Sequence, residues 1–232
     1  MEVGIRPVPF WHKVIGKRVF KHKSAGSQPH VLRLDPATAR PGPYTGLGAE
    51  IAHWLGATFL KLMGWKIQGD WPDLDKAVLV AAPHTSNWDG LYMFAVAARY
   101  RVRLSWMGKK SLTAGPFGWV VRAAGCVPID RSAAHGVVDA MVEAFASRDR
   151  LILLVPPEGT RSLTPVWKTG FYNIAAQAGV PLLLAVPDFG TKTFSFAAVI
   201  TPTGDYETDL PVIQSFYQGV KGLRPDKFVA AG

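Results

Sequence analysis

Short apolar runs alternate with helical patterns along the chain beyond Gly64. Apolar runs bounded by loop residues predict buried strands, and apolar positions repeating every three or four residues predict the helices between them. The predicted strands are residues 77–82, 102–107, 127–129, 151–155, 182–186 and 194–200, and the predicted helices are 88–99, 111–124, 135–147 and 170–178. This alternation is typical of a single α/β domain in which helices flank a mixed, largely parallel sheet.

Residues 47–63 carry a further helical pattern with few polar positions. Its apolar residues recur on one face of a helix and comprise Leu47, Ile51, Trp54, Leu55, Phe59 and Leu62. Helices this apolar are usually buried, so we expect the face to pack into the core; the alternative is that part of it enters lipid. We interpret His53, on the same helix, as a surface histidine.

The chain before this helix is strongly basic. Residues 1–46 hold eight of the 26 basic residues but two of the 17 acidic ones, together with several aromatic residues. A stretch rich in Pro and Gly, residues 36–48, is typical of a linker. We therefore predict a basic N-terminal arm and linker over 1–46 and the α/β domain over 47–232. Two interpretations of the arm stay open: loose packing on the domain, or electrostatic contact with a membrane.

Composition narrows the classes of partner. The 232 residues are 48% hydrophobic and carry a net charge of +9, which favours nucleic acid, a phosphorylated substrate or an acidic membrane surface. One cysteine, Cys126, excludes an internal disulfide and the thiolates of a structural zinc site. No stretch reaches the roughly 20 apolar residues of a membrane span, and the start lacks a secretory signal. We expect a cytoplasmic protein, held peripherally at the inner face of the cell membrane.

Residues suited to catalysis first appear where the predicted strand 77–82 ends. Serine-hydrolase, zinc-protease, dinucleotide and P-loop motifs are absent from the sequence. His84 and Asp89 stand at the strand-to-helix turn, where open α/β sheets bind ligands. A carboxylate held against one imidazole nitrogen would leave the other free as a general base. An alternative stays open, because Ser86 as N-cap and Asp89 three residues later also match a capping box.

Further charged residues follow other strand ends. Glu158 and Arg161 follow one predicted strand, Lys168 precedes the next helix, and Arg131 and Lys109 follow two other strands. Basic side chains and a helix N-terminus at adjacent strand ends are suited to a phosphate group. Taken singly, the same residues fit ordinary surface ion pairs equally well.

Taken in order, four blocks of the sequence resemble the glycerolipid acyltransferase family, which includes the bacterial 1-acylglycerol-3-phosphate acyltransferases. They are H-T-S-N-W-D from His84, G-C-V-P-I-D-R from Gly125, P-E-G-T-R-S from Pro157 and V-P-L-L-L from Val180. Their order and spacing match over residues 64–220. A joint match of this kind is far more specific than any one block, and it implies a glycerolipid acyltransferase-like α/β fold.

The resemblance implies transfer of a fatty acyl group from acyl-CoA or acyl carrier protein to the hydroxyl of a lysophospholipid, above all 1-acylglycerol-3-phosphate. It makes His84 the general base and Asp89 its orienting group, with no metal and no cofactor besides the thioester co-substrate. The residues expected to bind substrate are Ser86, Lys109, Arg131, Glu158, Gly159, Thr160, Arg161 and Lys168. The expected partners are the acyl donor, the acceptor and an anionic membrane surface, and not nucleic acid.

Departures from the family pattern leave the acceptor open. Pro83 stands where many members have Asn, Pro156 where they have Phe, and Leu184 replaces a second proline. The same mechanism could therefore serve a glycolipid, an amino-acid lipid or a secondary metabolite. A basic protein that only binds membrane or nucleic acid is the remaining alternative.

Overall fold

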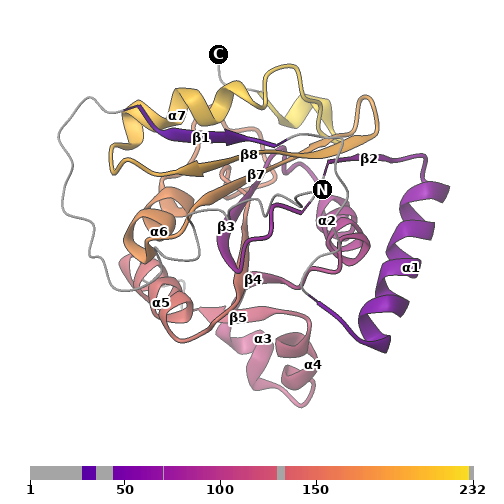
Figure 1. Ribbon diagram of the computed structural model, residues 1–232. Helices are drawn as coiled ribbons and strands as arrows, with labels where there is room; N and C mark the ends of the chain where they lie inside the picture. Colours follow the sequence, from indigo (N-terminus) through magenta and orange to yellow (C-terminus); the bar gives the residue numbers. More distant parts are fainter. Residues whose placement is uncertain (1–27, 35–43, 70, 130–133, 230–232) are drawn as a thin grey trace, which may run out of the picture.

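The computed structural model describes residues 28–34, 44–69, 71–129 and 134–229, and eight strands within these ranges form one sheet (Figure 1). The strands are β1 (His30–Arg33), β2 (Lys66–Gln68), β3 (Lys76–Ala81), β4 (Leu104–Lys109), β5 (Cys126–Ile129), β6 (Leu151–Val155), β7 (Leu182–Asp188) and β8 (Thr193–Thr201). They lie in the order β1-β8-β7-β3-β6-β4-β5, and β2 pairs with β8. The β7-β3-β6-β4-β5 part is parallel, whereas β8 runs antiparallel to β7 and β1. The predicted mixed, largely parallel α/β sheet is confirmed.

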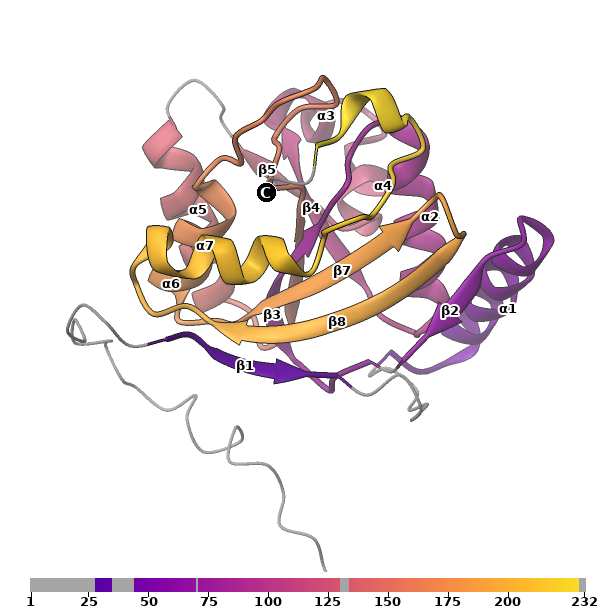
Figure 2. The ribbon, with the colours of Figure 1, turned by 90° about the horizontal axis from the view of Figure 1, so that it is seen from above.

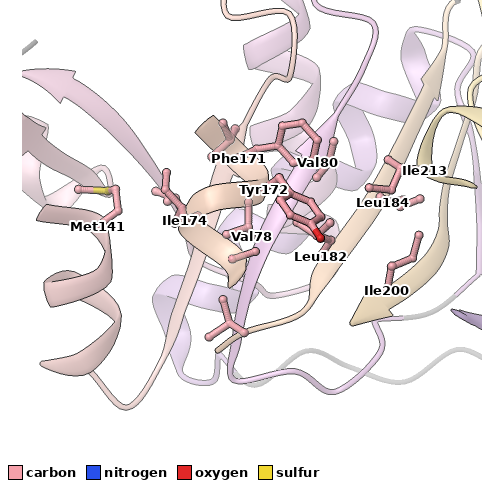
Figure 3. Close-up of a cluster of buried hydrophobic side chains, with 14 of the residues drawn as sticks. Val78, Val80, Met141, Phe171, Tyr172, Ile174, Leu182, Leu184, Ile200 and Ile213 are labelled. Carbon is pink, nitrogen blue, oxygen red and sulfur yellow. The ribbon is translucent and has the colours of Figure 1, made fainter. Parts of the chain in front are cut away.

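Helices cover both faces of this sheet (Figure 2). The cover on one face consists of α5 (Ala134–Ala146), α6 (Gly170–Ala178) and α7 (Tyr206–Ser215), and that on the other of α1 (Leu47–Leu62) and α2 (Asn87–Arg99). Successive side chains of a strand point to opposite faces. Val78 and Val80 of β3 therefore join the core under α5, α6 and α7 (Figure 3), and Leu79 joins the core under α2.

The crossover from β4 to β5 differs from its prediction as one helix over 111–124. It contains two short helices, α3 (Lys110–Ala114) and α4 (Gly118–Ala123). The break falls at Gly115 and Pro116, two residues that disfavour a helix interior. The N–H of Gly118 donates to the carbonyl of Gly115 at 2.8 Å, which closes the turn between the helices.

The expectation that the apolar face of α1 lies in the core is wrong, except for Phe59, which packs against the core. Leu47 and Leu62 are 79% and 75% exposed, and Ile51, Trp54 and Leu55 are exposed as well. The buried face carries other residues instead, including Ala49, Gly56 and Leu60. A Cβ atom at Gly56 would lie 2.6 Å from the Ala95 carbonyl oxygen, so the glycine lets α1 approach the backbone of α2.

His53 lies on this buried face of α1, so its interpretation as a surface histidine is also wrong. Its Nδ1 atom lies 2.7 Å from the carbonyl oxygen of Arg99, near the end of α2. The helical pattern of large apolar residues did not reveal this contact, because the packing face of α1 combines Leu60 with small residues and a hydrogen bond. No helix of the described residues is both long enough and apolar enough to cross a bilayer.

The N-terminal arm is described in part. Its residues 30–33 form β1 and pair antiparallel with β8, a contact that the sequence did not predict. A four-residue strand at the edge of a sheet is too short to show a clear alternation. Most of residues 1–46 lie outside the described residues, so the choice between loose packing and membrane contact of the arm is not tested.

Candidate active site

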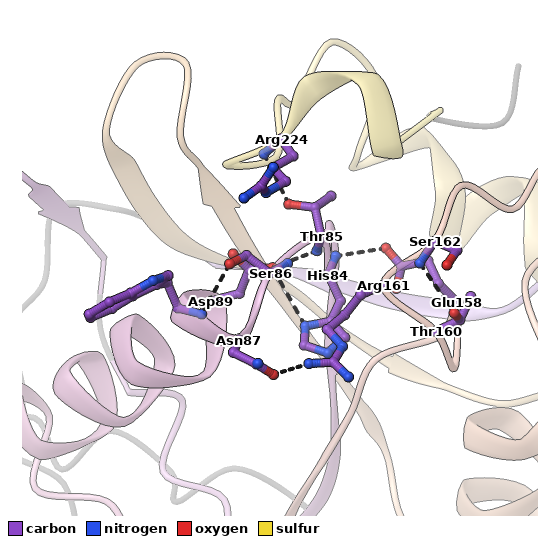
Figure 4. Close-up of polar contacts among 11 residues, drawn as sticks. His84, Thr85, Ser86, Asn87, Asp89, Glu158, Thr160, Arg161, Ser162 and Arg224 are labelled. Atoms are coloured by element: carbon purple, nitrogen blue, oxygen red, sulfur yellow. Dashed lines mark hydrogen bonds and ion pairs between the residues drawn. The ribbon is translucent and has the colours of Figure 1, made fainter.

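Two loops meet at the carboxyl ends of neighbouring strands. Val80 of β3 pairs in parallel register with Val155 of β6, so the residues that follow the two strands emerge side by side. His84 lies in the first loop and Glu158 in the second (Figure 4). The prediction that both residues lie at the carboxyl ends of neighbouring strands is therefore confirmed.

His84 and Asp89 face each other across the turn into α2. The Nδ1 atom of His84 lies 3.5 Å from Oδ2 of Asp89, and the His84 side chain is 27% exposed while Asp89 is buried. A proton on Nδ1 points at the carboxylate in this arrangement, which leaves Nε2 without one in the neutral ring. The pair can therefore act as a base with an orienting group.

Asp89 also caps α2, so the two interpretations of the sequence describe one arrangement. Its Oδ2 atom accepts the N–H groups of Thr85 at 2.5 Å and Ser86 at 2.7 Å. The Ser86 hydroxyl in turn accepts the N–H of Trp88 at 3.3 Å, which completes a capping box. These bonds fix the backbone that follows the histidine, and the same carboxylate oxygen serves the helix and the imidazole.

Glu158 holds the histidine loop from the neighbouring strand end. Its Oε1 atom accepts the N–H of His84 at 2.9 Å. The side chain is only 4% exposed, and its Oε2 atom has no hydrogen-bond partner among the described residues. Burial raises the pKa of this carboxyl. The buried side chain thus contacts the loop that carries His84.

Arg161 stands beside the start of α2. Its guanidinium donates to the side-chain oxygen of Asn87 (Figure 4), and its side chain is exposed. Lys168 lies across Gly159, because a Cβ atom on that glycine would be 2.8 Å from the lysine Cδ. Thr160 accepts the N–H of Ser162 at 3.2 Å and so shapes the same loop. The structure thus brings two cations, Arg161 and Lys168, to the loops that follow β3 and β6.

Two other predicted residues are not brought into this set of contacts. Lys109 is exposed at the last residue of β4, two strands from β3 in the sheet. Arg131 lies outside the described residues. In the ranges that the structure covers, no group of His, Cys, Asp and Glu is arranged to hold a metal ion.

The end of the chain contributes contacts that sequence reasoning missed. The Tyr217 hydroxyl donates to the carbonyl of Val80 at 2.9 Å, and burial raises the pKa of this tyrosine. The N–H of Arg224 donates to the Thr85 hydroxyl at 3.1 Å (Figure 4). A Cβ atom at Gly222 would lie 2.6 Å from Cγ2 of Thr85. No motif marks these residues, because each contact joins a side chain to the backbone of a residue far away in the chain.

Comparisons with known proteins identify related sequences. The chain is similar to proteins named 1-acyl-sn-glycerol-3-phosphate acyltransferase from Haemophilus influenzae, at 30% identity over 147 residues, and from Streptococcus pneumoniae, at 31% over 133 residues. These matches cover 59% and 53% of this chain, and 59% and 48% of the relatives. The chain thus matches only about half to three fifths of the length of these relatives.

A solved structure has a similar fold, and a family model matches part of the chain. The fold resembles that of the 1-acyl-sn-glycerophosphate acyltransferase PlsC from Thermotoga maritima, with a TM-score of 0.51 and 18% identity over 76% of this chain and 80% of the other. The model of the Acyltransferase family matches residues 66–186, a range that contains His84, Asp89, Glu158 and Arg161. With more than half of its length matched in this way, the chain belongs to the Acyltransferase family.

Proposed function

We propose that this protein transfers a fatty acyl group from a thioester to the free hydroxyl of a lysophosphatidate-like acceptor, 1-acylglycerol-3-phosphate. The observation that carries the proposal is the His84–Asp89 pair, 3.5 Å apart, with Arg161 beside it. The names of the two relatives support the same acceptor. The pair supplies a base for the hydroxyl, and the guanidinium supplies a partner for the phosphate.

The reaction follows from the orientation of the imidazole. Nε2 of His84 takes the proton of the acceptor hydroxyl while the hydroxyl oxygen attacks the thioester carbon. The tetrahedral intermediate collapses, the new C–O ester bond remains, and the C–S bond breaks. The imidazolium returns its proton to the leaving sulfur, which departs as a thiol. Asp89 stabilises the imidazolium between these two proton transfers.

Transfer in one complex with both substrates fits the surroundings better than an acyl-enzyme. The hydroxyls of Thr85 and Ser86, next to His84 in the chain, accept backbone N–H groups and help to order the turn. Cys126 is buried at the amino end of β5, whereas His84 follows the carboxyl end of β3. Neither the hydroxyls of Thr85 and Ser86 nor the thiol of Cys126 is therefore arranged as a nucleophile that His84 could activate.

The acceptor phosphate is assigned to Arg161 and Lys168. Both cations are exposed and border the loop that begins at Glu158. Glu158, Gly159 and Thr160 order this loop, and Ser86 orders the turn opposite. Lys109 and Arg131 remain proposed contacts from the neighbouring strand ends. Guanidinium groups bind phosphate in a bidentate manner, so Arg161 takes the leading role.

We place the enzyme at the anionic inner face of the cell membrane, from which the acceptor would be taken, with acyl-CoA or acyl carrier protein as donor. The exposed apolar side of α1 supports this placement, because Trp54, Leu55 and Leu62 are held in water on a helix that packs through its other face. Side chains of this kind enter the boundary between head groups and acyl chains.

An acceptor screen tests the proposal. Purified protein is given one acyl-CoA and a panel that contains 1-acylglycerol-3-phosphate, its dephosphorylated form, a glycolipid and an acylated amino acid, and thiol release and product mass are followed. We expect the phosphorylated acceptor to react fastest, and His84→Ala to remove that activity while far-UV circular dichroism stays unchanged. Preference for an acceptor without phosphate would contradict the assignment of Arg161.

A further inference from the structure

The β4–β5 crossover exposes large apolar side chains together with cations. Phe117 and Trp119 are 74% and 71% exposed, and Leu112 and Val120 are exposed as well. Lys110 and Arg122, at the two ends of the crossover helices, are also exposed. We call these six residues the crossover surface. It lies at the β5 edge of the sheet, on α3, α4 and the turn between them (Figure 1).

The backbone of the crossover holds its aromatic side chains outward. Gly118, between Phe117 and Trp119, is buried, and a Cβ atom there would lie 2.1 Å from the carbonyl oxygen of Thr113. Thr113 is itself buried, and its hydroxyl donates to the carbonyl of Lys110 at 3.0 Å. Because Gly118 faces inward against α3, its two neighbours are directed to solvent.

All charged residues in and around the crossover are basic. Residues 90–129 contain six basic residues and no acidic one. One of the six, Arg101, is neutralised by an ion pair with Glu50 at 2.7 Å, and another, Arg103, lies over the ring of Tyr44. Lys110 and Arg122 form no ion pair with the described residues. The crossover surface is therefore complementary to an anionic partner.

The end of α4, next to the crossover surface, and α1 border the same depression. A hollow of about 190 Å³ is lined by Ala52 of α1, Phe94 of α2 and Ala123 at the end of α4, with Arg103 among the other lining residues. One extended partner can therefore reach both α1 and the end of α4 across this hollow. A lipid surface has this extent, and exposed Trp and Phe next to basic residues are typical of its head-group region.

We propose that the crossover surface binds anionic phospholipid and selects the charge of the membrane on which the enzyme works. This proposal depends on the proposed function only because the acyl acceptor of that reaction lies in a membrane. The exposed side of α1 carries large apolar residues, and Glu50 of that helix is already paired, so α1 supplies mainly apolar contact, with one exposed cation, Lys61, in its last turn. Lys110 and Arg122 supply that preference, and Phe117 and Trp119 enter the interface.

Vesicle flotation tests the proposal with the full chain. Two variants, Lys110→Gln/Arg122→Gln and Phe117→Ser/Trp119→Ser, are compared with wild type on vesicles of phosphatidylcholine and on vesicles that also contain an equal amount of phosphatidylglycerol. The control is Arg33→Gln/Arg148→Gln, which removes two exposed cations, one on the opposite edge strand β1 and one after α5. Thermal unfolding establishes that all variants are folded.

The charge variant should lose roughly fivefold in binding per cation on phosphatidylglycerol vesicles and little on phosphatidylcholine. The aromatic variant should bind both kinds more weakly, and the control should bind like wild type. If the folded charge variant binds vesicles as well as wild type does, the proposal is overturned. If that variant in addition loses transfer from acyl carrier protein, the crossover surface binds an acidic protein instead of lipid. Binding is measured without turnover, so these outcomes do not depend on whether the proposed acyl transfer occurs.

Discussion

Asp89→Asn separates the two tasks that one carboxylate performs in this structure. Oδ2 of Asp89 accepts two backbone N–H groups and faces Nδ1 of His84 at 3.5 Å. An asparagine oxygen can still accept the backbone N–H groups, and asparagine is as good a helix cap as aspartate. The amide carries no charge, however, and cannot stabilise the imidazolium that the proposed mechanism forms.

The size of the effect follows from the distance. Two unit charges about 4 Å apart interact by about 4 kcal/mol at the effective dielectric of a site near a protein surface. The 27% exposure of the His84 side chain makes that surface value appropriate. Loss of about 4 kcal/mol of stabilisation in the transition state lowers kcat roughly a thousandfold. The free energy of unfolding should change by less than about 1 kcal/mol, since the cap remains.

The assay pairs thiol release, measured at saturating donor and acceptor, with chemical denaturation of the same preparations. Asp205→Asn is the matched control, because Asp205 caps α7 by accepting the N–H groups of Glu207 and Thr208. It should keep full activity. If Asp89→Asn retains kcat within a few-fold of wild type, the contact with His84 serves only the cap and the reasoning fails.

Three further outcomes can be measured. Arg161→Ala should raise the KM for 1-acylglycerol-3-phosphate at least tenfold and leave the KM for the donor within twofold, as initial rates would show. Burial raises the pKa of Glu158 above its ordinary value of 4.5. The contribution of this carboxyl to the free energy of unfolding is therefore fully present below pH 4.5 and is lost as the pH rises through the pKa of the folded state. Denaturation curves should therefore show Glu158→Gln gaining stability relative to wild type from acid to neutral pH, and a constant difference would contradict this. Gly222→Ala should lower the free energy of unfolding by about 1 to 3 kcal/mol, because its Cβ would meet the Thr85 side chain.

The sheet was predictable because its strands are buried on both faces. Runs such as residues 77–82 and 151–155 stand out as continuous apolar segments between loop residues. The side of α1 that packs was not predictable in the same way. Periodicity shows which residues share a face, but Gly56 and His53 pack on α2 through close approach and one hydrogen bond. Hydrophobic pattern alone therefore assigned the wrong face to the core.

The candidate site was predictable where chemistry and spacing coincide. His84 and Asp89 are five residues apart, and the turn that their spacing suggests is present. The buried position of Glu158 depends on the parallel register of β3 and β6. Contacts from Tyr217 and Arg224 could not be found, because they join residues more than 130 positions apart through backbone atoms. Such contacts leave no pattern in a single sequence.

The contacts between the end of the chain and Thr85 also bear on when the loop becomes ordered. Synthesis proceeds from the N-terminus, so residues 84–89 leave the ribosome long before Gly222 and Arg224 are made. Until then the Thr85 hydroxyl lacks the N–H of Arg224, 139 residues further on. A growing chain therefore holds the histidine motif without its final support. The loop that carries His84 therefore reaches its final set of hydrogen bonds only after Arg224 has been made.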